Sequence, residues 1–250
     1  MNHWSIREIH QEYFTQLKRY MKFKKRMVFS PDLVTIRGVK LLVNKDLPVR
    51  MRKALYRERY EDTEARCILA KLEHDDIVME IGAGYGFISI LCSKAIGSKR
   101  VFTYEANPAL IPTIKHHFLK NHVSPTLTNA ALSTSKANEI QFQIESEFWA
   151  SSIGKKTASS IGLQVPNLYI NDEIHKVKPT FLIMDVEGYE AELLPIADFS
   201  GICKILVEFH PNIIGEDQLR QLRSVLTHHG YTADTSISER KIIYLERIPF

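Results

Sequence analysis

The sequence predicts an α/β protein whose mainly parallel sheet carries helices on both faces. From residue 77 onward, short apolar runs alternate with segments of helical periodicity. A glycine-rich bend follows the first of these runs, and the 250 residues are enough to bury a full core. Because crossover helices cover both faces of a parallel sheet, this alternation favours that architecture.

Three elements are expected before the alternating part. Residues 5–26 repeat apolar side chains at helical spacing, and "LVTIRGVKLLV" (33–43) predicts a short hairpin with Gly38 in its turn. "TEARCILAKL" (63–72) has helical spacing again. This helix delivers the chain to the glycine-rich bend.

The alternating part predicts five strands and four helices. The strands are expected at 77–81, 101–104, 126–132, 181–186 and 202–209. The helices are expected at 84–96, 108–120, 189–197 and 216–229. Residues 138–145 alternate with period two and indicate an added strand, whereas the Ser-, Gly- and Lys-rich segment 151–162 indicates a mobile loop within one domain.

Charge is distributed unevenly along the chain. The net charge is +4, but residues 1–60 contain 15 Lys/Arg against 5 Asp/Glu, which leaves 18 against 24 in the remainder. The densest cluster is "KRYMKFKKR" (18–26). It indicates either a contact surface for phosphate-bearing partners, such as nucleic acid, anionic lipid or a nucleotide-linked substrate, or the solvated face of an amphipathic helix.

Cysteine usage and hydropathy predict a cytoplasmic protein with no membrane span. Cys67, Cys92 and Cys203 are widely spaced and form no CxxC pair, which fits a reducing compartment and gives no zinc pattern. No apolar run approaches the roughly 18 residues that a spanning helix needs. The first 14 residues lack the apolar core of a signal peptide.

The bend lies in "MEIGAGYGFISI" (79–90), where Gly82, Gly84 and Gly86 separate a strand from a helix. Such a turn brings backbone N–H groups and a helix N-terminus against a ligand, and glycines allow close approach. The sequence therefore predicts a nucleotide cradle. A purely structural tight turn is the alternative.

An acidic residue at the end of the next strand points to an adenosine ligand. Glu105 follows Gly84 by 21 residues and ends the strand in "RVFTYEANP". A carboxylate there can accept both hydroxyl hydrogens of a ribose. The alternative is that Glu105 caps the following helix, whose first turn contains Pro108.

Two residues around the glycines favour S-adenosylmethionine over a nicotinamide dinucleotide. The dinucleotide fingerprint has glycine at its third position, where this chain has Phe87. Glu80 stands in front of the glycines instead. A carboxylate would repel a pyrophosphate, but it suits a ligand with a cationic amino group and a sulfonium.

Taken together, several segments resemble the FkbM-type S-adenosylmethionine-dependent methyltransferases. They are, in order, "YEDTEARCILAKLEHDDIVMEIGAGYGFISI", "VFTYEANP", "LTNAALS", "FLIMDVEGYEAELL" and "ILVEFHP". The resemblance covers about residues 59–210, and its D-x-E-G-x-E element is the most specific part. It implies a Rossmann-like class I methyltransferase fold with a seven-stranded sheet. It also implies O-methylation of a hydroxyl on a sugar, a glycan or a polyketide-like small molecule.

The same resemblance implies roles for individual residues. Those lining the donor would be Glu80, Gly82, Ala83, Gly84 and Gly86. Glu105, with Ala106 beside it, would hold the ribose, while Asn129 and Ala130 would lie near the adenine. Tyr60 and Glu61 match the upstream "YE" of the family and would close over the donor. Position 80 carries glutamate, where aspartate is the commoner residue in the family. This difference keeps the negative charge but changes how far the side chain reaches.

The limits of the resemblance divide the chain. Residues 59–250 are expected to form the S-adenosylmethionine-binding domain, and residues 1–58 a basic helical and hairpin extension. Because the extension lies outside the recognisable part, we expect it to bear on the acceptor.

The segment "FLIMDVEGYE" (181–190) holds the expected chemistry. On an extended strand Asp185 and Glu187 share one face, so both carboxylates would emerge at the carboxyl edge beside the glycine turn. An alcohol is a poor nucleophile until its proton leaves. A nearby base is therefore expected, and such a base contributes on the order of 10²–10⁴-fold.

Several assignments of that base remain open. Asp185 or Glu187 can serve, with Glu190 one helical turn beyond. Alternatively, Asp185 caps a helix or binds the donor, and Glu187 only orients the turn at Gly188. His210, in "VEFHP", is a rival base or a histidine bonded to its loop. A divalent ion on the two carboxylates is a third option. Because no further ligand set is evident, no metal site is predicted.

Other functions follow from other readings of the same residues. Amino-directed DNA methyltransferases carry Asn/Asp-Pro-Pro-aromatic where this chain has Asp185-Val186-Glu187-Gly188, so a DNA substrate is not expected. An NAD-dependent oxidoreductase is the enzymatic alternative. The non-enzymatic alternative is an adenosine-ligand-binding module that engages RNA or a membrane through its basic N-terminus.

Overall fold

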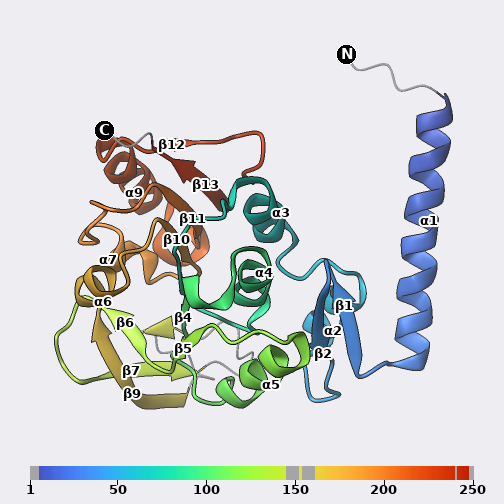
Figure 1. Ribbon diagram of the computed structural model, residues 1–250, viewed down its shortest axis with the longest axis horizontal. Helices are drawn as coiled ribbons and strands as arrows, with labels where there is room; N and C mark the ends of the chain where they lie inside the picture. Colours follow the sequence, from blue (N-terminus) through green and yellow to red (C-terminus); the bar gives the residue numbers. More distant parts are fainter. Residues whose placement is uncertain (1–5, 145–151, 154–160, 240, 248–250) are drawn as a thin grey trace. The chain divides into compact units, whose positions relative to one another are not determined.

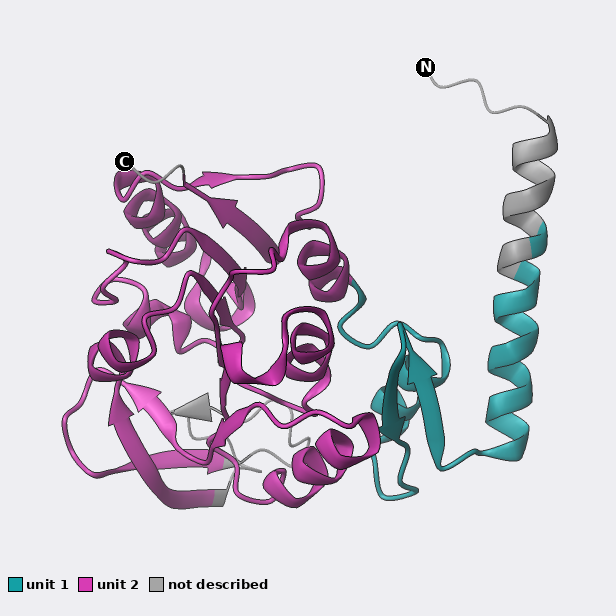
Figure 2. Cartoon of the chain, viewed as in Figure 1, with its two compact units in different colours: residues 1–62 teal, residues 63–250 magenta. Residues whose placement is uncertain are grey.

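The structure is a computed structural model that describes residues 6–144, 152–153, 161–239 and 241–247. The chain divides into two compact units, Met1–Asp62 and Thr63–Phe250 (Figure 2). Each unit is described separately. The expected division into domains at residue 58 stays a prediction.

Unit 1 consists of a long helix, a hairpin and a short helix. Its elements are α1 (Ile6–Phe29), β1 (Leu33–Ile36), β2 (Val39–Leu42) and α2 (Val49–Tyr56). β1 and β2 pair antiparallel, and Gly38 takes a φ of +80° in the turn between them. The predicted helix and hairpin are confirmed. α2 was not predicted; it spans eight residues and buries Met51, Leu55 and Tyr56.

Part of the basic cluster makes ion pairs inside unit 1. Lys22 Nζ and Arg26 Nη1 lie 2.5 and 2.9 Å from Glu58 Oε1, and Arg26 also donates to the Tyr56 carbonyl. Burial opposes ionisation of Glu58, but the two cations prevail and lower its pKa. Several apolar side chains of α1 are exposed: Phe14, Tyr20, Met21, Val28 and Phe29.

Unit 2 is built on a sheet with the strand order β12-β13-β11-β10-β3-β4-β5 (Figure 1). Its strands are β3 (Val78–Ile81), β4 (Val101–Tyr104), β5 (Thr126–Thr128), β10 (Phe181–Met184), β11 (Lys204–Glu208), β12 (Thr232–Ala233) and β13 (Ile242–Glu246). The five strands from β11 to β5 are parallel, and β13 and β12 add antiparallel pairs at one edge. The predicted mainly parallel seven-stranded sheet is confirmed.

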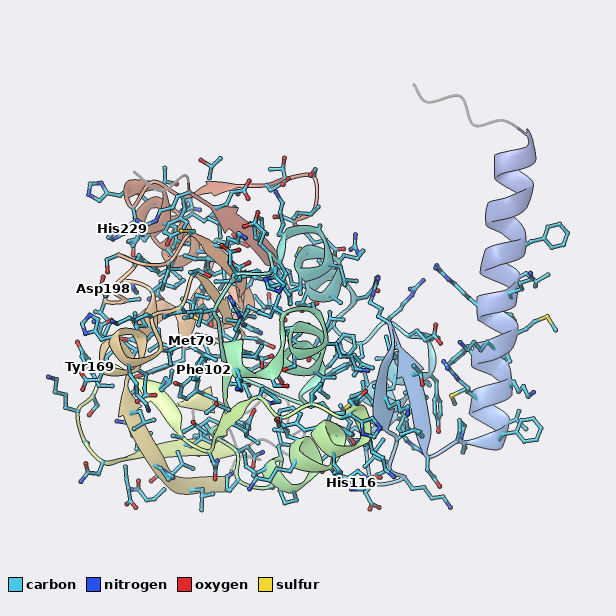
Figure 3. The ribbon with its side chains drawn as sticks, viewed as in Figure 1. Met79, Phe102, His116, Tyr169, Asp198 and His229 are labelled. Atoms are coloured by element: carbon cyan, nitrogen blue, oxygen red, sulfur yellow. The ribbon has the colours of Figure 1, made fainter. Side chains whose placement is uncertain are left out.

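Helices cover both faces of this sheet (Figure 1). They are α3 (Asp62–Lys71), α4 (Phe87–Ile96), α5 (Ile111–Asn121), α6 (Ile170–Val177), α7 (Glu190–Leu193), α8 (Pro211–Ile214) and α9 (Glu216–His228), with a 3₁₀ turn at Ser98–Arg100. Residues of α6, α7 and α9 pack with Met79, Leu182 and Ile205 in one buried core. Met79 and Phe102 mark this core in Figure 3.

Two predicted helices begin later than expected, and one is shorter. Those expected at 84–96 and 108–120 begin at Phe87 and Ile111, and α4 starts late because Gly84 and Gly86 have positive φ angles. The helix expected at 189–197 is α-helical only over Glu190–Leu193. Boundaries of this kind depend on turn geometry, which apolar periodicity does not report.

The single strand expected at 126–132 was wrong. β5 ends at Thr128, and the chain crosses to β6 (Ala131–Ser133) in a second sheet of order β6-β9-β7-β8. The other strands of that sheet are β7 (Glu139–Ile144), β8 (Ser152–Ile153) and β9 (Ile161–Tyr169). β7 confirms the added strand expected at 138–145. Most of the loop expected at 151–162 lies outside the described residues, although Ile161 already begins β9.

Candidate active site

The glycine turn after β3 is held close to the end of β10. Gly82 takes a φ of +91°, and a Cβ built on it would lie 1.8 Å from the Asp185 carbonyl oxygen. The backbone N–H groups of Gly82 and Ala83 both donate to the Tyr104 carbonyl, each over 3.0 Å. Glycine at position 82 is therefore required by two backbones in contact as well as by the turn.

Glu105 lies at the end of β4 and binds the glycine turn. Its Oε2 accepts the N–H of Gly84 over 2.9 Å, and its Oε1 accepts the N–H of Asn107 over 2.8 Å. Burial raises the pKa of Glu105 to about 7, although N–H donors from Asn107, Gly84 and Ala106 favour the ionised form. The structure thus joins the predicted ribose ligand to the predicted cradle.

Asn129 and Ala130 lie directly beside Glu105. The side-chain amide of Asn129 donates to the carbonyl oxygens of Glu105 and Ala106 over 2.8 and 3.3 Å. These hydrogen bonds form at the point where the chain leaves the main sheet after Thr128. It also gathers the expected adenine-side residues at the end of β4.

Glu80 is buried beneath the glycine turn. Only 2% of the residue is exposed, and its Oε2 accepts a 2.6 Å hydrogen bond from Thr103 Oγ1. Burial raises the pKa of Glu80 to about 8, against the hydrogen bonds from Thr103 and Ser89 that lower it. Its expected contact with the donor stays a prediction. The same holds for Tyr60 and Glu61, which belong to unit 1.

His117 holds the glycine turn from α5, and it was not predicted. Its Nδ1 lies 2.8 Å from the Tyr85 carbonyl, and the two rings meet edge to face with centroids 4.5 Å apart. Burial lowers the pKa of His117 to about 4, so the imidazole is neutral near pH 7. In sequence it reads only as a histidine on a helix. Its neighbour His116 and the pair His228 and His229 are exposed, as Figure 3 shows for His116 and His229.

Asp185, Glu187 and His210 form an acid–imidazole cluster at the carboxyl edge of the sheet. His210 Nε2 lies 3.1 Å from Glu187 Oε2 and 3.7 Å from Asp185 Oδ1. The strand argument that placed both carboxylates on one face was wrong in detail, because β10 ends at Met184 and Glu187 has a φ of +50°. The turn nevertheless brings both carboxylates to the end of β11, where His210 lies.

Glu190 fixes the geometry of this cluster. It is fully buried and accepts the backbone N–H of Gly188 over 2.7 Å and that of His210 over 2.8 Å. Its Oε1 also lies 3.4 Å from His210 Nδ1. One carboxylate thus ties the turn after β10 to the end of β11 and faces the imidazole nitrogen that points away from Glu187.

The pKa values of Glu187 and His210 are both raised. Burial by itself would lower the pKa of His210, but its hydrogen bond to the Glu190 carboxylate and the charges of Glu187, Glu190 and Glu208 raise that pKa. Burial raises the pKa of Glu187. The charge of His210 lowers this pKa, whereas the charges of Glu208 and Glu190 raise it further. Both shifts favour the protonated form, so the His210–Glu187 pair is suited to hold a proton.

The cluster adjoins the glycine turn directly. The Asp185 N–H donates to the Ile81 carbonyl over 3.0 Å, and the Asp185 carbonyl faces Gly82. The two halves of the candidate site therefore share the edge of the sheet where open α/β folds bind ligands.

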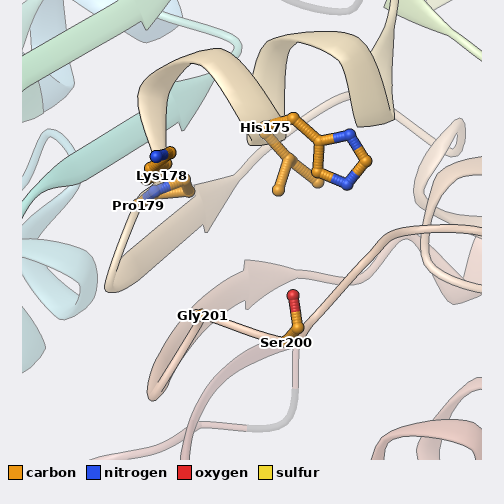
Figure 4. Close-up of a pocket in the computed structure, with 6 residues that line it drawn as sticks. His175, Lys178, Pro179, Ser200 and Gly201 are labelled. Carbon is orange, nitrogen blue, oxygen red and sulfur yellow. The ribbon is translucent and has the colours of Figure 1, made fainter.

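A cavity of about 440 Å³ lies elsewhere (Figure 4). It is lined by Ile174, His175, Lys178, Pro179, Ser200 and Gly201. Pro179 precedes β10 and Gly201 precedes β11, which places the cavity at the amino edge of the parallel strands. We therefore place the candidate active site at the opposite edge, with the acids and the imidazole.

This sheet order and glycine turn define an α/β fold of the Rossmann-like, class I methyltransferase type. The family model "Methyltransferase FkbM domain" matches residues 76–233, well over half of the chain. The protein belongs to the FkbM methyltransferase family, as the sequence resemblance implied. It is a methyltransferase, and its cofactor is S-adenosylmethionine.

The chain is similar to several solved structures, of which the one from Streptococcus mutans supports the fold. A protein from Streptococcus mutans assigned as a SAM-dependent methyltransferase is 9% identical to this chain, with a TM-score of 0.50. The match covers 86% of this chain and 56% of the Streptococcus mutans chain. A methyltransferase from Pyrococcus furiosus is 11% identical (TM-score 0.47; 92% and 96% covered). A precorrin-6y C5,15-methyltransferase from Geobacter metallireducens GS-15 is 16% identical (TM-score 0.46; 82% and 90% covered). A comparison with curated proteins finds no match.

None of the helices described in the structure is both long enough and apolar enough to cross a bilayer.

Proposed function

We propose that this methyltransferase transfers a methyl group from S-adenosylmethionine to a hydroxyl oxygen of a sugar, a glycan or another small natural product. The observation that carries the proposal is the acid–imidazole cluster of Asp185, Glu187 and His210 at the sheet edge beside the glycine turn. Transfer to oxygen needs a group that takes up a proton. The cluster supplies such groups where the acceptor would meet the donor.

The residues around the turn fit the donor. Both oxygens of Glu105 already accept backbone N–H groups, and a carboxylate has about four acceptor sites, so ribose hydroxyls can add to these bonds. Gly84 and Gly86 would present bare backbone, and Ala106, Asn129 and Ala130 would border the adenine. Glu80 would line the donor from beneath the turn. S-adenosylmethionine supplies the activated methyl group, and this chain orients it.

The charge around the cluster bears on the acceptor. Four carboxylates, those of Asp185, Glu187, Glu190 and Glu208, lie within 3.9 Å of an imidazole nitrogen of His210. Such a site disfavours a phosphate next to the reacting hydroxyl. It favours a neutral polyol. A phosphate-bearing part of the acceptor would instead suit the basic cluster at 18–26, which stays a prediction.

The test is incubation of the full chain with isotopically labelled S-adenosylmethionine and a panel of glycans, glycolipids and small alcohols. We expect label in an O-methyl ether, identified by mass spectrometry of the product. Gly84→Val serves as the control, because a branched side chain at a φ of +53° would block the donor turn. Label on nitrogen or carbon only would contradict the proposal.

The two alternatives predict different binding. Membership of the family favours the methyl donor over NAD, so calorimetry should show binding of S-adenosylhomocysteine and none of NAD. A non-catalytic module would bind S-adenosylhomocysteine, turn over no acceptor, and bind RNA or anionic vesicles with strong salt dependence through its basic N-terminus. A cytoplasmic location stays a prediction from the three free cysteines.

Donor affinity is expected to fall as the pH drops below about 7, the pKa that burial gives Glu105. Ribose hydroxyls donate to the ionised carboxylate, so binding lowers this pKa and must expel a proton from the acid form. The dissociation constant for S-adenosylhomocysteine should therefore rise by up to about tenfold per pH unit below that value. Calorimetry between pH 5.5 and 7.5 measures it.

Two variants decide whether Glu105 causes this pH dependence. Glu105→Gln should bind more weakly at pH 7.5 and show a flatter pH profile. Glu173→Gln removes another buried carboxylate, one that accepts from Tyr104 and Lys176, and should keep the profile of the unmodified protein. A profile that is unchanged in Glu105→Gln would exclude Glu105 as the titrating ribose ligand.

A further inference from the structure

We propose that Asp185, Glu187 and His210 bind a divalent cation, with Mn²⁺ as the best-matched ion. Among the residues that the structure describes, these three form a group whose ligand atoms all lie within 4.8 Å of one another. The two carboxylates leave the end of β10 and the imidazole leaves the end of β11. The sequence alone suggested only the carboxylates as ligands, and the fold adds a nitrogen donor.

The distances fit one face of a coordination shell. In an octahedral site with bonds of about 2.2 Å, neighbouring donors lie about 3.1 Å apart and opposite donors about 4.4 Å apart. His210 Nε2 lies 3.1 Å from Glu187 Oε2 and 3.7 Å from Asp185 Oδ1. Small side-chain movements would therefore bring all three atoms onto one ion.

The surroundings of His210 match those of a metal-binding imidazole. Such a histidine usually directs its second ring nitrogen at a carboxylate, which fixes the tautomer and the orientation of the ring. Here Nδ1 faces Oε1 of the fully buried Glu190 at 3.4 Å, and the same oxygen accepts the His210 backbone N–H over 2.8 Å. Glu190 thus presents Nε2 to Asp185 and Glu187, and the imidazole is itself nine-tenths buried.

The donor set selects among cations. Two carboxylates with water suit Mg²⁺, Ca²⁺ and Mn²⁺, whereas an imidazole favours transition metals. Mn²⁺ accepts both kinds of donor and keeps open positions. The next step rests on the proposed function. One open position on the ion would take the acceptor hydroxyl and lower the pKa of that hydroxyl. The second carboxylate oxygen of Glu187 would then receive the proton.

The test is titration of the full chain with Mn²⁺ alone, followed by electron paramagnetic resonance and calorimetry, without donor or acceptor. We expect one ion per chain. Pulsed resonance should detect coupling to a ¹⁴N nucleus, which reports the His210 imidazole in the unmodified protein. Asp185→Ala and His210→Ala should weaken binding by more than about 100-fold, and Glu190→Gln by about 10–100-fold through loss of positioning.

Glu208→Gln is the matched control. Glu208 Oε1 lies 3.9 Å from the same Nε2, so the variant removes an equal charge from the neighbourhood without removing one of the three ligands. Its Mn²⁺ affinity should stay within about threefold of the unmodified protein, because screening weakens a charge that does not coordinate the ion. An equal loss in Glu208→Gln and Asp185→Ala would show diffuse attraction and overturn the proposal.

Absence of stoichiometric Mn²⁺, or bound Mn²⁺ without ¹⁴N coupling, would also overturn it. The same samples are titrated with S-adenosylhomocysteine. If the protein binds S-adenosylhomocysteine normally but does not bind Mn²⁺, the cation site is excluded and the proposed function still stands. If the protein binds Mn²⁺ specifically but methylates only nitrogen or carbon, the cation site stands and the proposed function is excluded.

Discussion

Alanine at position 82 is expected to abolish measurable binding of S-adenosylhomocysteine and to lower the free energy of unfolding by roughly 2–5 kcal/mol. Gly82 has a φ of +91°, and a Cβ there would lie 1.8 Å from the Asp185 carbonyl oxygen and 2.9 Å from its carbon. Both partners are backbone, so the clash can be relieved only by parting the ends of β3 and β10. That movement would displace the glycine turn and Asp185 together.

Gly97 provides a matched control for this substitution. It has a φ of +89°, nearly that of Gly82, but a Cβ there would meet nothing within 4 Å. Gly97 has a ψ of +141°, so Gly97→Ala should show only the cost of that strained backbone, roughly 1–3 kcal/mol, with S-adenosylhomocysteine affinity unchanged. Thermal or urea unfolding and calorimetry of both variants measure the difference. Equal effects of the two substitutions would mean that close approach at Gly82 is unimportant.

The main sheet was predictable because its signal is local. β3, β4, β10 and β11 are short runs buried over almost their full length, and each is followed by a segment of helical spacing. The second sheet was only partly predictable. β7 alternates visibly, but the break between β5 and β6 coincides with hydrogen bonds from the side-chain amide of Asn129 to carbonyls 23 and 24 residues away. Periodicity within one segment carries no trace of such a contact.

The candidate site shows the same division. The glycines, Glu105 and the carboxylates stand in recognisable local patterns at strand ends, so their common edge followed from the topology of a parallel sheet. His117 could not be found in this way, and neither could the role of Glu190, which the sequence offered only as an acid one helical turn beyond the pair. His117 acts on Tyr85 from another helix, and Glu190 is committed to the backbone of His210, 20 residues along the chain. Each has a role only once the fold brings its partner close.

Loss of either carboxylate beside His210 should reduce turnover by orders of magnitude without loss of donor binding. Glu187→Gln removes the group whose Oε2 lies 3.1 Å from Nε2, and Asp185→Asn removes the charge at 3.7 Å. An amide keeps the size of the side chain but can neither take up a proton nor stabilise a protonated imidazole by its charge. We expect kcat to fall by about 10²–10⁴-fold in each variant. S-adenosylhomocysteine affinity should stay within a few-fold, because the donor contacts proposed here lie around Gly84 and Glu105.

Glu192→Gln separates this effect from a general loss of negative charge. Glu192 lies on α7, two residues beyond Glu190, and is exposed, so its substitution should leave kcat and donor affinity unchanged. Steady-state rates with the acceptor found in the panel, together with calorimetry, give both quantities for all three variants. Wild-type rates in Glu187→Gln and Asp185→Asn would remove the cluster from the chemistry. A large loss of donor affinity in either would make that carboxylate a donor ligand, and the task of taking up the proton would then pass to His210, which Glu190 already holds at the same edge.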